Sequence, residues 1–193
     1  MRLTLLAVGL GAAASAGCAV VQRPQTFHLR CPAPPAATSP SVPLPVVPAT
    51  EPDRPVPIGT QFNRHGNVVH RIVPAELGAT LAADVAALLG TRAADPNEPG
   101  DRLELRLTRA ASNSEAARWT ELRGPVRSEL DVAARLFRAG AAPVELGSFH
   151  GEAEKRVAYI DASDHAETLE RAYCALLADF AARAPALRAA LTR

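Results

Sequence analysis

The sequence predicts a two-layer α+β domain, in which a mainly antiparallel sheet of about four strands carries two helices on one face. Two segments repeat apolar residues at helical spacing on one side only. Other segments alternate apolar and charged residues, as half-buried antiparallel strands do. The chain order runs strand, helix, strands, helix. Helices with one apolar side and strands with one apolar face bury these apolar surfaces against each other. The opposite, charged face of the sheet is then left exposed.

The first expected elements are a strand over residues 67–73 and the helix that follows it. Proline suits the first turn of a helix, so Pro74 is expected to open this helix. Gly90 is expected to end it, because glycine adopts the left-handed conformation of a helix C-terminus without strain. The apolar stripe of this helix consists of Leu77, Leu81, Val85, Leu88 and Leu89.

Three strands are expected next, after a loop over residues 93–101. Residues 102–109 alternate leucine with charged residues, which is typical of a strand with one face in the core. Residues 110–124 are polar and predict irregular structure. Residues 126–150 predict a hairpin that turns at residues 139–143. The inner face of its first strand is expected to hold Val126, Leu130, Val132, Ala134 and Leu136.

The last expected element is a helix that begins near Asp164. Ser163 or Asp164 can cap it, and Glu167 stands three residues after Asp164, as in a capping box. Pro185 is expected to kink or break the helix and to leave a short tail helix over residues 186–191, because proline lacks the N–H that a helix interior needs. The apolar stripe consists of Leu169, Tyr173, Leu176, Leu177 and Phe180.

The start of the chain predicts an export signal over residues 1–17. A positive Met1-Arg2 start precedes an apolar run over residues 3–14, which is shorter than the about 20 apolar residues that a membrane-spanning helix requires. The segment Ser15-Ala16-Gly17-Cys18 resembles a bacterial lipoprotein signal, which implies that Cys18 is acylated, with palmitate as a marker, and becomes the mature N-terminus. The alternative is an ordinary secretory signal followed by an incidental cysteine.

Residues 18–57 are expected to form a lipidated, proline-rich tether, and residues 58–193 a folded periplasmic domain. Ten prolines lie between Pro32 and Pro57. Proline removes backbone donors and fixes φ, which disfavours helix and sheet and favours an extended polyproline II chain. At ~3.1 Å per residue, about 25 residues of this proline-rich stretch could hold the domain up to about 80 Å from the membrane.

Two cysteines remain after Cys18, and they form an even pair in an exported chain. A disulfide between Cys31 and Cys174 is one outcome, because oxidising compartments preserve such bonds. Two separate thiols, one in the tether and one in the last helix, are the other outcome. The sequence leaves both open.

Composition and charge narrow the classes of function. The formal net charge is +1, no polybasic stretch is present and aromatic residues make up 4% of the chain, which argues against nucleic acid as a partner. The histidines and cysteines lack the spacing of a zinc site, so no metal or cofactor is expected. Ser148 and His150 are expected on one strand face about 7 Å apart, which keeps an envelope hydrolase as an alternative.

The charged side of the predicted sheet is the candidate partner interface. Arg127, Glu129, Asp131 and Arg135 alternate with the apolar residues of the hairpin and are therefore expected on its outer side. Their opposite charges compensate each other, which is typical of a solvated surface and also of the rim of a protein interface. Trp119 in the preceding segment is a further candidate, because tryptophan is enriched among residues that dominate binding.

The order of elements is similar to that of the ABC-type transport auxiliary lipoproteins of the Gram-negative envelope. The cysteine is followed by Thr26-Phe27-His28-Leu29, then by a proline-rich stretch, a strand, a helix, a hairpin and a final alanine-rich helix. The resemblance implies a lipid-anchored protein without catalysis of its own, which accompanies an MCE-type phospholipid transport complex. Ala19 stands where an inner-membrane retention signal has aspartate, which favours the periplasmic face of the outer membrane.

Two alternatives within the lipoprotein class stay open. Phe27-His28-Leu29-Arg30 resembles a segment of the LPS-assembly lipoprotein. A structural outer-membrane lipoprotein, for example one that grips the cell wall, shares the architecture of signal, tether and domain, and architecture alone does not determine function. The sequence names neither the partner nor the oligomeric state.

Overall fold

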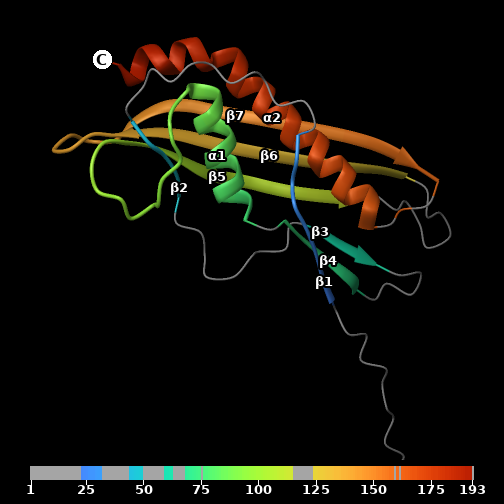
Figure 1. Ribbon diagram of the computed structural model, residues 1–193. Helices are drawn as coiled ribbons and strands as arrows, with labels where there is room; N and C mark the ends of the chain where they lie inside the picture. The colour runs from blue at the N-terminus through green and yellow to red at the C-terminus, as the bar shows by residue number, and fades with distance from the viewer. Residues whose placement is uncertain are drawn as a thin grey trace, which may run out of the picture.

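A computed structural model describes residues 23–31, 44–49, 59–62, 68–74, 76–114, 124–158, 160 and 162–192 (Figure 1). In chain order these residues form strands and helices as follows: β1 (Arg23–Phe27), β2 (Val46–Pro48), β3 (Gly59–Phe62), β4 (Val68–Pro74), α1 (Leu77–Leu89), β5 (Arg102–Ser114), β6 (Gly124–Phe137), β7 (Val144–Val157) and α2 (Ala162–Leu191).

The larger sheet contains four strands in the order β2-β5-β6-β7. β5, β6 and β7 pair antiparallel along most of their lengths, whereas β2 pairs parallel with β5 at the edge. Both helices lie on one face of this sheet, α2 along β6 and β7, and α1 beside β2 and α2 (Figure 1). The predicted α+β class, with a mainly antiparallel sheet and helices packed against it, is confirmed.

A second, smaller sheet has the strand order β1-β4-β3 and lies below the helices in the view of Figure 1. The first expected strand is β4, and the structure corrects its place, because it pairs with β1 and β3 instead of joining the larger sheet. β1 is parallel to β4, with Arg23 opposite His70. The sequence could not predict this pairing, because β1 lies in residues 18–57, which their proline content predicts to be a tether.

The expectation that residues 18–57 form only a tether is wrong for their described part. β1 and β2 lie within this range, and Leu29 and Val46 are buried in the core. The prolines do not prevent this, because β2 is an edge strand, where a missing N–H costs no sheet hydrogen bond. The Pro45 carbonyl accepts a hydrogen bond from the Leu103 amide at 2.9 Å. The fold therefore includes part of the expected tether.

A disulfide joins Cys31 to Cys174 in the middle of α2. The two Cα atoms are 5.2 Å apart, a usual separation for this bond. The cysteines are 143 residues apart in the chain, and a cross-link across so long a loop stabilises the fold by about 4 kcal/mol. The bond fastens the segment after β1 to the helix that covers the larger sheet.

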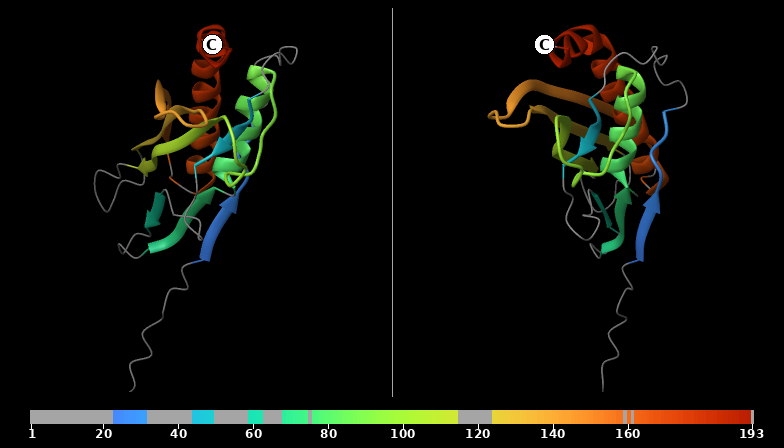
Figure 2. Two further views of the ribbon diagram at one scale, coloured as in Figure 1. Left: turned by 90° about the vertical axis from the view of Figure 1, so that its left-hand side faces the viewer. Right: turned by 60° about the vertical axis from the view of Figure 1, so that its left-hand side comes forward.

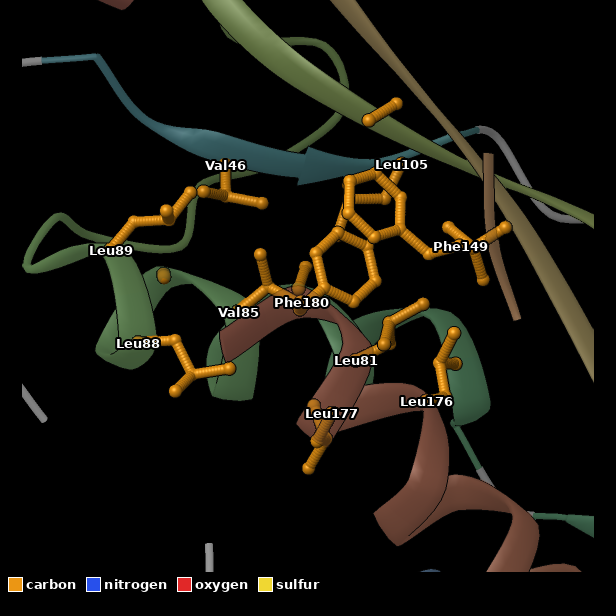
Figure 3. Close-up of a cluster of buried hydrophobic side chains, with 14 of the residues drawn as sticks. Val46, Leu81, Val85, Leu88, Leu89, Leu105, Phe149, Leu176, Leu177 and Phe180 are labelled. Atoms are coloured by element: carbon orange, nitrogen blue, oxygen red, sulfur yellow. The ribbon is translucent and has the colours of Figure 1, made fainter. Parts of the chain in front are cut away.

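The predicted apolar stripes form one core between the helices and the larger sheet (Figure 3). The stripe residues of α1 and α2 and the predicted inner-face residues of β6 are all buried. At the centre of this core, the rings of Phe149 and Phe180 stack with their centroids 3.8 Å apart. Leu81 and Val85 of α1 and Leu105 of β5 belong to the same cluster (Figure 3).

Several element boundaries differ from the prediction. Pro74 ends β4 and does not open α1, which begins at Leu77. Glu76, just before the helix, has a left-handed backbone with φ 49°, and this reversal separates strand from helix. Gly90 ends α1 as predicted, with φ 70°. β5 continues to Ser114, because β6 supplies a pairing partner along the segment whose polar composition predicts irregular structure.

The predicted break at Pro185 is wrong, because α2 continues through this residue. Proline removes one backbone hydrogen bond from a helix. Beyond it, Leu187 and Leu191 are both buried in the core. Arg188 donates a hydrogen bond to the Leu88 carbonyl of α1 at 2.7 Å. Burial and this contact hold the last turns of the helix in place.

The N-terminal end of α2 binds a lysine of β7. The helix begins at Ala162, so the predicted capping residues lie within its first turns. Lys155 Nζ lies 2.9 Å from Asp164 Oδ1 and also binds the Glu167 carboxylate. The hydrogen bond to Glu167, followed by that to Asp164, raises the pKa of Lys155, so the ammonium stays charged.

Gly151 of β7 marks a close approach of α2 to the sheet. A Cβ atom there would lie 2.1 Å from the Ala172 carbonyl oxygen and 2.5 Å from the Leu176 amide nitrogen, both of them backbone atoms. We expect Gly151→Ala to lower the free energy of unfolding by about 3 kcal/mol, measured by denaturant titration. Ser148→Ala, on the opposite face of the same strand, is the control and should change it by less than about 0.5 kcal/mol. An unchanged unfolding midpoint in Gly151→Ala would contradict this packing.

Candidate functional site

The face of the larger sheet that points away from both helices is the candidate functional site. Side chains alternate along a strand, so the positions between the buried residues of β5, β6 and β7 lie on this face. The register places side chains of β5 and β7 beside the four predicted residues of β6. We call this surface the outer face and define it by Arg106, Arg109, Arg127, Glu129, Asp131, Ala133, Arg135, Glu145, Ser148, His150 and Glu152.

One network of ion pairs crosses three strands of the outer face. The Arg127 guanidinium lies 3.0 Å from Glu129 Oε1 and 2.8 Å from Glu152 Oε2. Arg109 of β5 binds the other Glu129 oxygen at 2.7 Å. The Glu152 carboxylate, and after it that of Glu129, raises the pKa of Arg127. Because Arg127 and Glu152 are more than half exposed, solvent screens their pairing, which contributes little to stability.

Beside this network, His150 of β7 pairs with Asp131 of β6. The imidazole Nδ1 lies 2.6 Å from Asp131 Oδ1, and Nε2 lies 3.8 Å from Glu152 Oε2. The hydrogen bond with Asp131 raises the pKa of His150 above its ordinary value of 6.5. The outer face therefore contains a histidine whose charged form is favoured by a neighbouring carboxylate.

The other end of the outer face carries a separate ion pair between Arg135 and Glu145, whose atoms lie 2.6 Å apart. Between this ion pair and the network around Arg127, the register aligns Arg106 of β5, Ala133 of β6 and Ser148 of β7 side by side. Ala133 and Ser148 are small, and Arg106 is an exposed arginine. An open surface with balanced charges suits contact with another protein better than enclosure of a small substrate.

The structure brings the four predicted β6 residues together on one surface. Trp119 and Cys18 lie outside the described residues, so they remain predictions. The Cys31–Cys174 disulfide lies at α2, on the side of the sheet opposite the outer face. Sequence reasoning missed Arg109 as a member of the outer face, because a bulge between Leu107 and Arg109 shifts the alternation of β5.

The geometry of Ser148 and His150 does not favour the hydrolase alternative. A nucleophilic serine needs a histidine nitrogen within hydrogen-bond reach as its base. The two ring nitrogens of His150 instead face the carboxylates of Asp131 and Glu152. The Ser148 carbonyl accepts a hydrogen bond from Arg183 of α2, which is a structural contact at the edge of the sheet.

A buried chain of hydrogen bonds between the sheet and α2 was not predicted. The Ser128 hydroxyl donates to Ser112 Oγ at 2.9 Å, and Ser112 Oγ lies 2.8 Å from His165 Nδ1. All three side chains are almost fully buried. Ser128 stands at an inner position of β6 between Val126 and Leu130. A polar residue at a position where the sequence pattern expects an apolar one could have indicated these buried hydrogen bonds.

Metal-ion clusters and membrane-spanning helices are both absent from the part of the chain that the structure describes. Within it, no three histidine, cysteine, aspartate or glutamate side chains are arranged to hold a metal ion. Neither α1 nor α2 combines the length with the apolar composition that crossing a bilayer requires.

The fold is similar to the crystal structure of protein XCC0632 from Xanthomonas campestris, which carries the family description DUF330. The TM-score is 0.50, the sequence identity is 14%, and the match covers 86% of this chain and 95% of the Xanthomonas chain. At this identity, the similarity concerns the fold alone. No protein-family model matches the sequence, and no curated protein matches it.

The His150–Asp131 pair predicts a histidine that titrates above its ordinary pKa of 6.5, and magnetic resonance titration of the ring measures this. The raised pKa means that the pair contributes stability that is fully present below pH 6.5 and is lost as the pH rises through the folded-state pKa. Asp131→Asn should return the pKa of His150 toward 6.5, whereas Glu152→Gln should lower it less, because Glu152 makes a smaller contribution. Equal effects of the two variants would contradict the pairing.

Proposed function

We propose that this protein is a lipid-anchored lipoprotein on the periplasmic face of the outer membrane, where it acts as a non-enzymatic partner of an envelope phospholipid transport system. Acyl chains on Cys18 hold it to the bilayer, and the outer face binds a protein of the transport complex. Three features support the proposal: the disulfide, the sequence around Cys18 and the outer face.

The disulfide between Cys31 and Cys174 is the observation that carries the proposal. Disulfides persist in oxidising compartments such as the bacterial periplasm and are rare in the cytosol. The bond therefore supports export, in agreement with the signal expected over residues 1–17. The lipoprotein-like segment then supplies Cys18 as the attachment point, where more than one acyl chain is needed for stable anchoring.

The outer face supports binding over catalysis. Its acidic and basic side chains are largely satisfied by each other, and both nitrogens of His150 face carboxylates. A partner protein that places basic groups opposite the acidic ones of the outer face, and acidic groups opposite the basic ones, can replace these internal ion pairs with intermolecular ones. Such a pattern favours one register and one orientation of docking. Such specificity is what an auxiliary subunit of a complex requires.

The resemblance to the ABC-type transport auxiliary lipoproteins supplies the kind of partner. The helix, strand, hairpin and final helix on which that resemblance rests correspond to α1, β5, the β6–β7 hairpin and α2. The phospholipid transport role comes from this resemblance, and the fold shared with the Xanthomonas protein is compatible with it.

The mass of the mature protein isolated from membranes tests the anchor. We expect residues 18–193 plus acyl groups, with incorporation of a palmitate analogue. Cys18→Ser should abolish the label and release the chain from the membrane. Cys31→Ser is the control, because it also replaces a cysteine and breaks the Cys31–Cys174 disulfide but keeps the attachment site, and it should retain the label. A soluble, unacylated wild-type product would overturn the anchor.

Charge reversal tests binding through the outer face. The double variant Asp131→Arg with Arg135→Glu keeps the net charge but places like charges against the partner. Crosslinking to envelope transport complexes in cells should fall more than about tenfold. The double variant Glu170→Arg with Arg171→Glu on α2 makes the same exchange elsewhere and should crosslink as the wild type does. Undiminished crosslinking by a folded Asp131→Arg, Arg135→Glu protein would place the interface elsewhere.

A further inference from the structure

β7 forms one edge of the larger sheet, whose strand order is β2-β5-β6-β7. An edge strand presents backbone N–H and C=O groups to which a further strand can bind, unless something covers them. The His150 amide shows which residues of β7 present such groups. It donates a hydrogen bond to Asp179 Oδ2 of α2 at 3.1 Å, so it points away from β6. Because this direction alternates along a strand, the backbone groups of every second residue from Ser148 to Arg156 point the same way.

The first half of this edge is covered by α2. The Asp179 carboxylate binds the His150 amide, and Arg183 donates a hydrogen bond to the Ser148 carbonyl at 2.8 Å. The helix crosses the sheet obliquely and reaches the β7 edge with its C-terminal half (Figure 1). A bulge at Leu146 interrupts the register with β6 near the start of the strand. Covering side chains and bulges are means by which proteins keep edge strands from pairing.

The second half of the β7 edge has no such cover among the residues that the structure describes. Within this part of the chain, the outward backbone groups of Glu152, Glu154 and Arg156 bind no other element. The segment from Glu152 to Arg156 contains neither a proline nor a bulge, and the three residues are exposed. We call this surface the open edge and define it by Glu152, Glu154 and Arg156.

The side chains of the open edge carry a definite pattern of charge. They lie on the outer-face side of β7, because they alternate with inner positions such as the buried Gly151. The Glu154 carboxylate lies 3.8 Å from Arg156 Nε, which is beyond hydrogen-bond distance, and the Arg156 side chain is 87% exposed. Residues directly opposite each other on paired strands interact, and opposite charges stabilise the pair. An added strand is therefore favoured when it places a basic residue beside Glu154 and an acidic one beside Arg156.

We infer that the open edge binds an extended segment of the protein partner in the proposed function, on which this inference rests. The segment adds to β7 as an antiparallel strand, with basic residues opposite Glu152 and Glu154 and an acidic residue opposite Arg156. Main-chain hydrogen bonds supply the affinity of such a strand, and its side chains supply the specificity. The added strand extends the outer face on the side away from both helices, so that one partner can contact both surfaces (Figure 2).

A second copy of this chain is the alternative occupant of the open edge. In the antiparallel register with the greatest overlap, the second copy matches Glu152 with Arg156 but brings the Glu154 residues of both copies together at the centre. Like charges directly opposite each other destabilise a pair of strands. A segment with a basic residue at this position avoids the repulsion, so the charge pattern favours a different protein.

Amide hydrogen exchange tests the open edge in the mature chain with Cys18→Ser and an intact disulfide. The amides of Glu152 and Glu154 should exchange more than about tenfold faster than those of Gly151 and Ala153, which point toward β6. The probe is a short peptide that alternates threonine with charged residues in the order glutamate, lysine, lysine. At millimolar concentration it should slow exchange at Glu152 and Glu154. Uniform exchange along the free strand, or no protection by the peptide, would overturn the inference.

Variants of Glu154 separate backbone pairing from charge. Glu154→Pro removes an N–H that points to solvent, where an edge strand tolerates proline, and should weaken peptide binding more than about tenfold. Glu154→Gln should weaken it about threefold, because it removes one pair of opposite charges across the strands. Glu170→Gln on α2 removes the same charge elsewhere and should bind the peptide as the wild type does. Equal binding by all three variants would contradict pairing at this edge.

A modified probe keeps the test decisive where Glu154→Pro does not fold. The same peptide with methylated backbone nitrogens keeps its charges but cannot donate the hydrogen bonds of a strand, so it should bind more than about tenfold more weakly. Equal binding of both peptides would overturn the inference, and so would a dimer of the free protein in which the amides of Glu152 and Glu154 are protected. Acylation of Cys18 and crosslinking in cells are measured separately, so failure of the proposed function and failure of the open edge give different results.

Discussion

The packing of α2 on the inner face of the larger sheet is the interaction on which the rest of the structure depends. It requires Gly151, where the helix backbone approaches too closely for a side chain. The helix also protects the N-terminal half of the β7 edge, because Asp179 accepts a hydrogen bond from the His150 amide and Arg183 donates one to the Ser148 carbonyl. With one face covered and part of this edge bonded to the helix, the outer face is the sheet surface left for solvent or a partner.

α2 also connects the elements that do not belong to the larger sheet. Cys174 holds the segment after β1 through the disulfide. Tyr173 donates a hydrogen bond to Asp84 of α1 at 2.6 Å, and burial followed by this contact raises the pKa of the phenol, so it stays protonated. Arg188 binds a carbonyl at the C-terminal end of α1, where a cation is favoured by the helix dipole. The helix thereby places the small sheet and α1 relative to the core.

The outer face is a polar surface whose charges are neutralised locally. Acidic and basic side chains there lie within hydrogen-bond distance of each other, as Arg127 does with Glu129 and Glu152. Such an arrangement favours a protein with a complementary pattern of charges over a surface of uniform charge.

The sequence by itself determined what local periodicity reports: the apolar stripes of α1 and α2, the inner side of β6, and the outer-face positions of residues such as Glu129 and Asp131. The tertiary structure alone decided which distant segments meet. It paired β4 with β1, bonded Cys31 to Cys174, joined His150 to Asp131 and continued α2 through Pro185. Periodicity shows which side of an element is apolar. Which strand or helix an element pairs with depends instead on the free energy of the whole packed chain, and the local sequence of a short strand next to prolines does not reveal it.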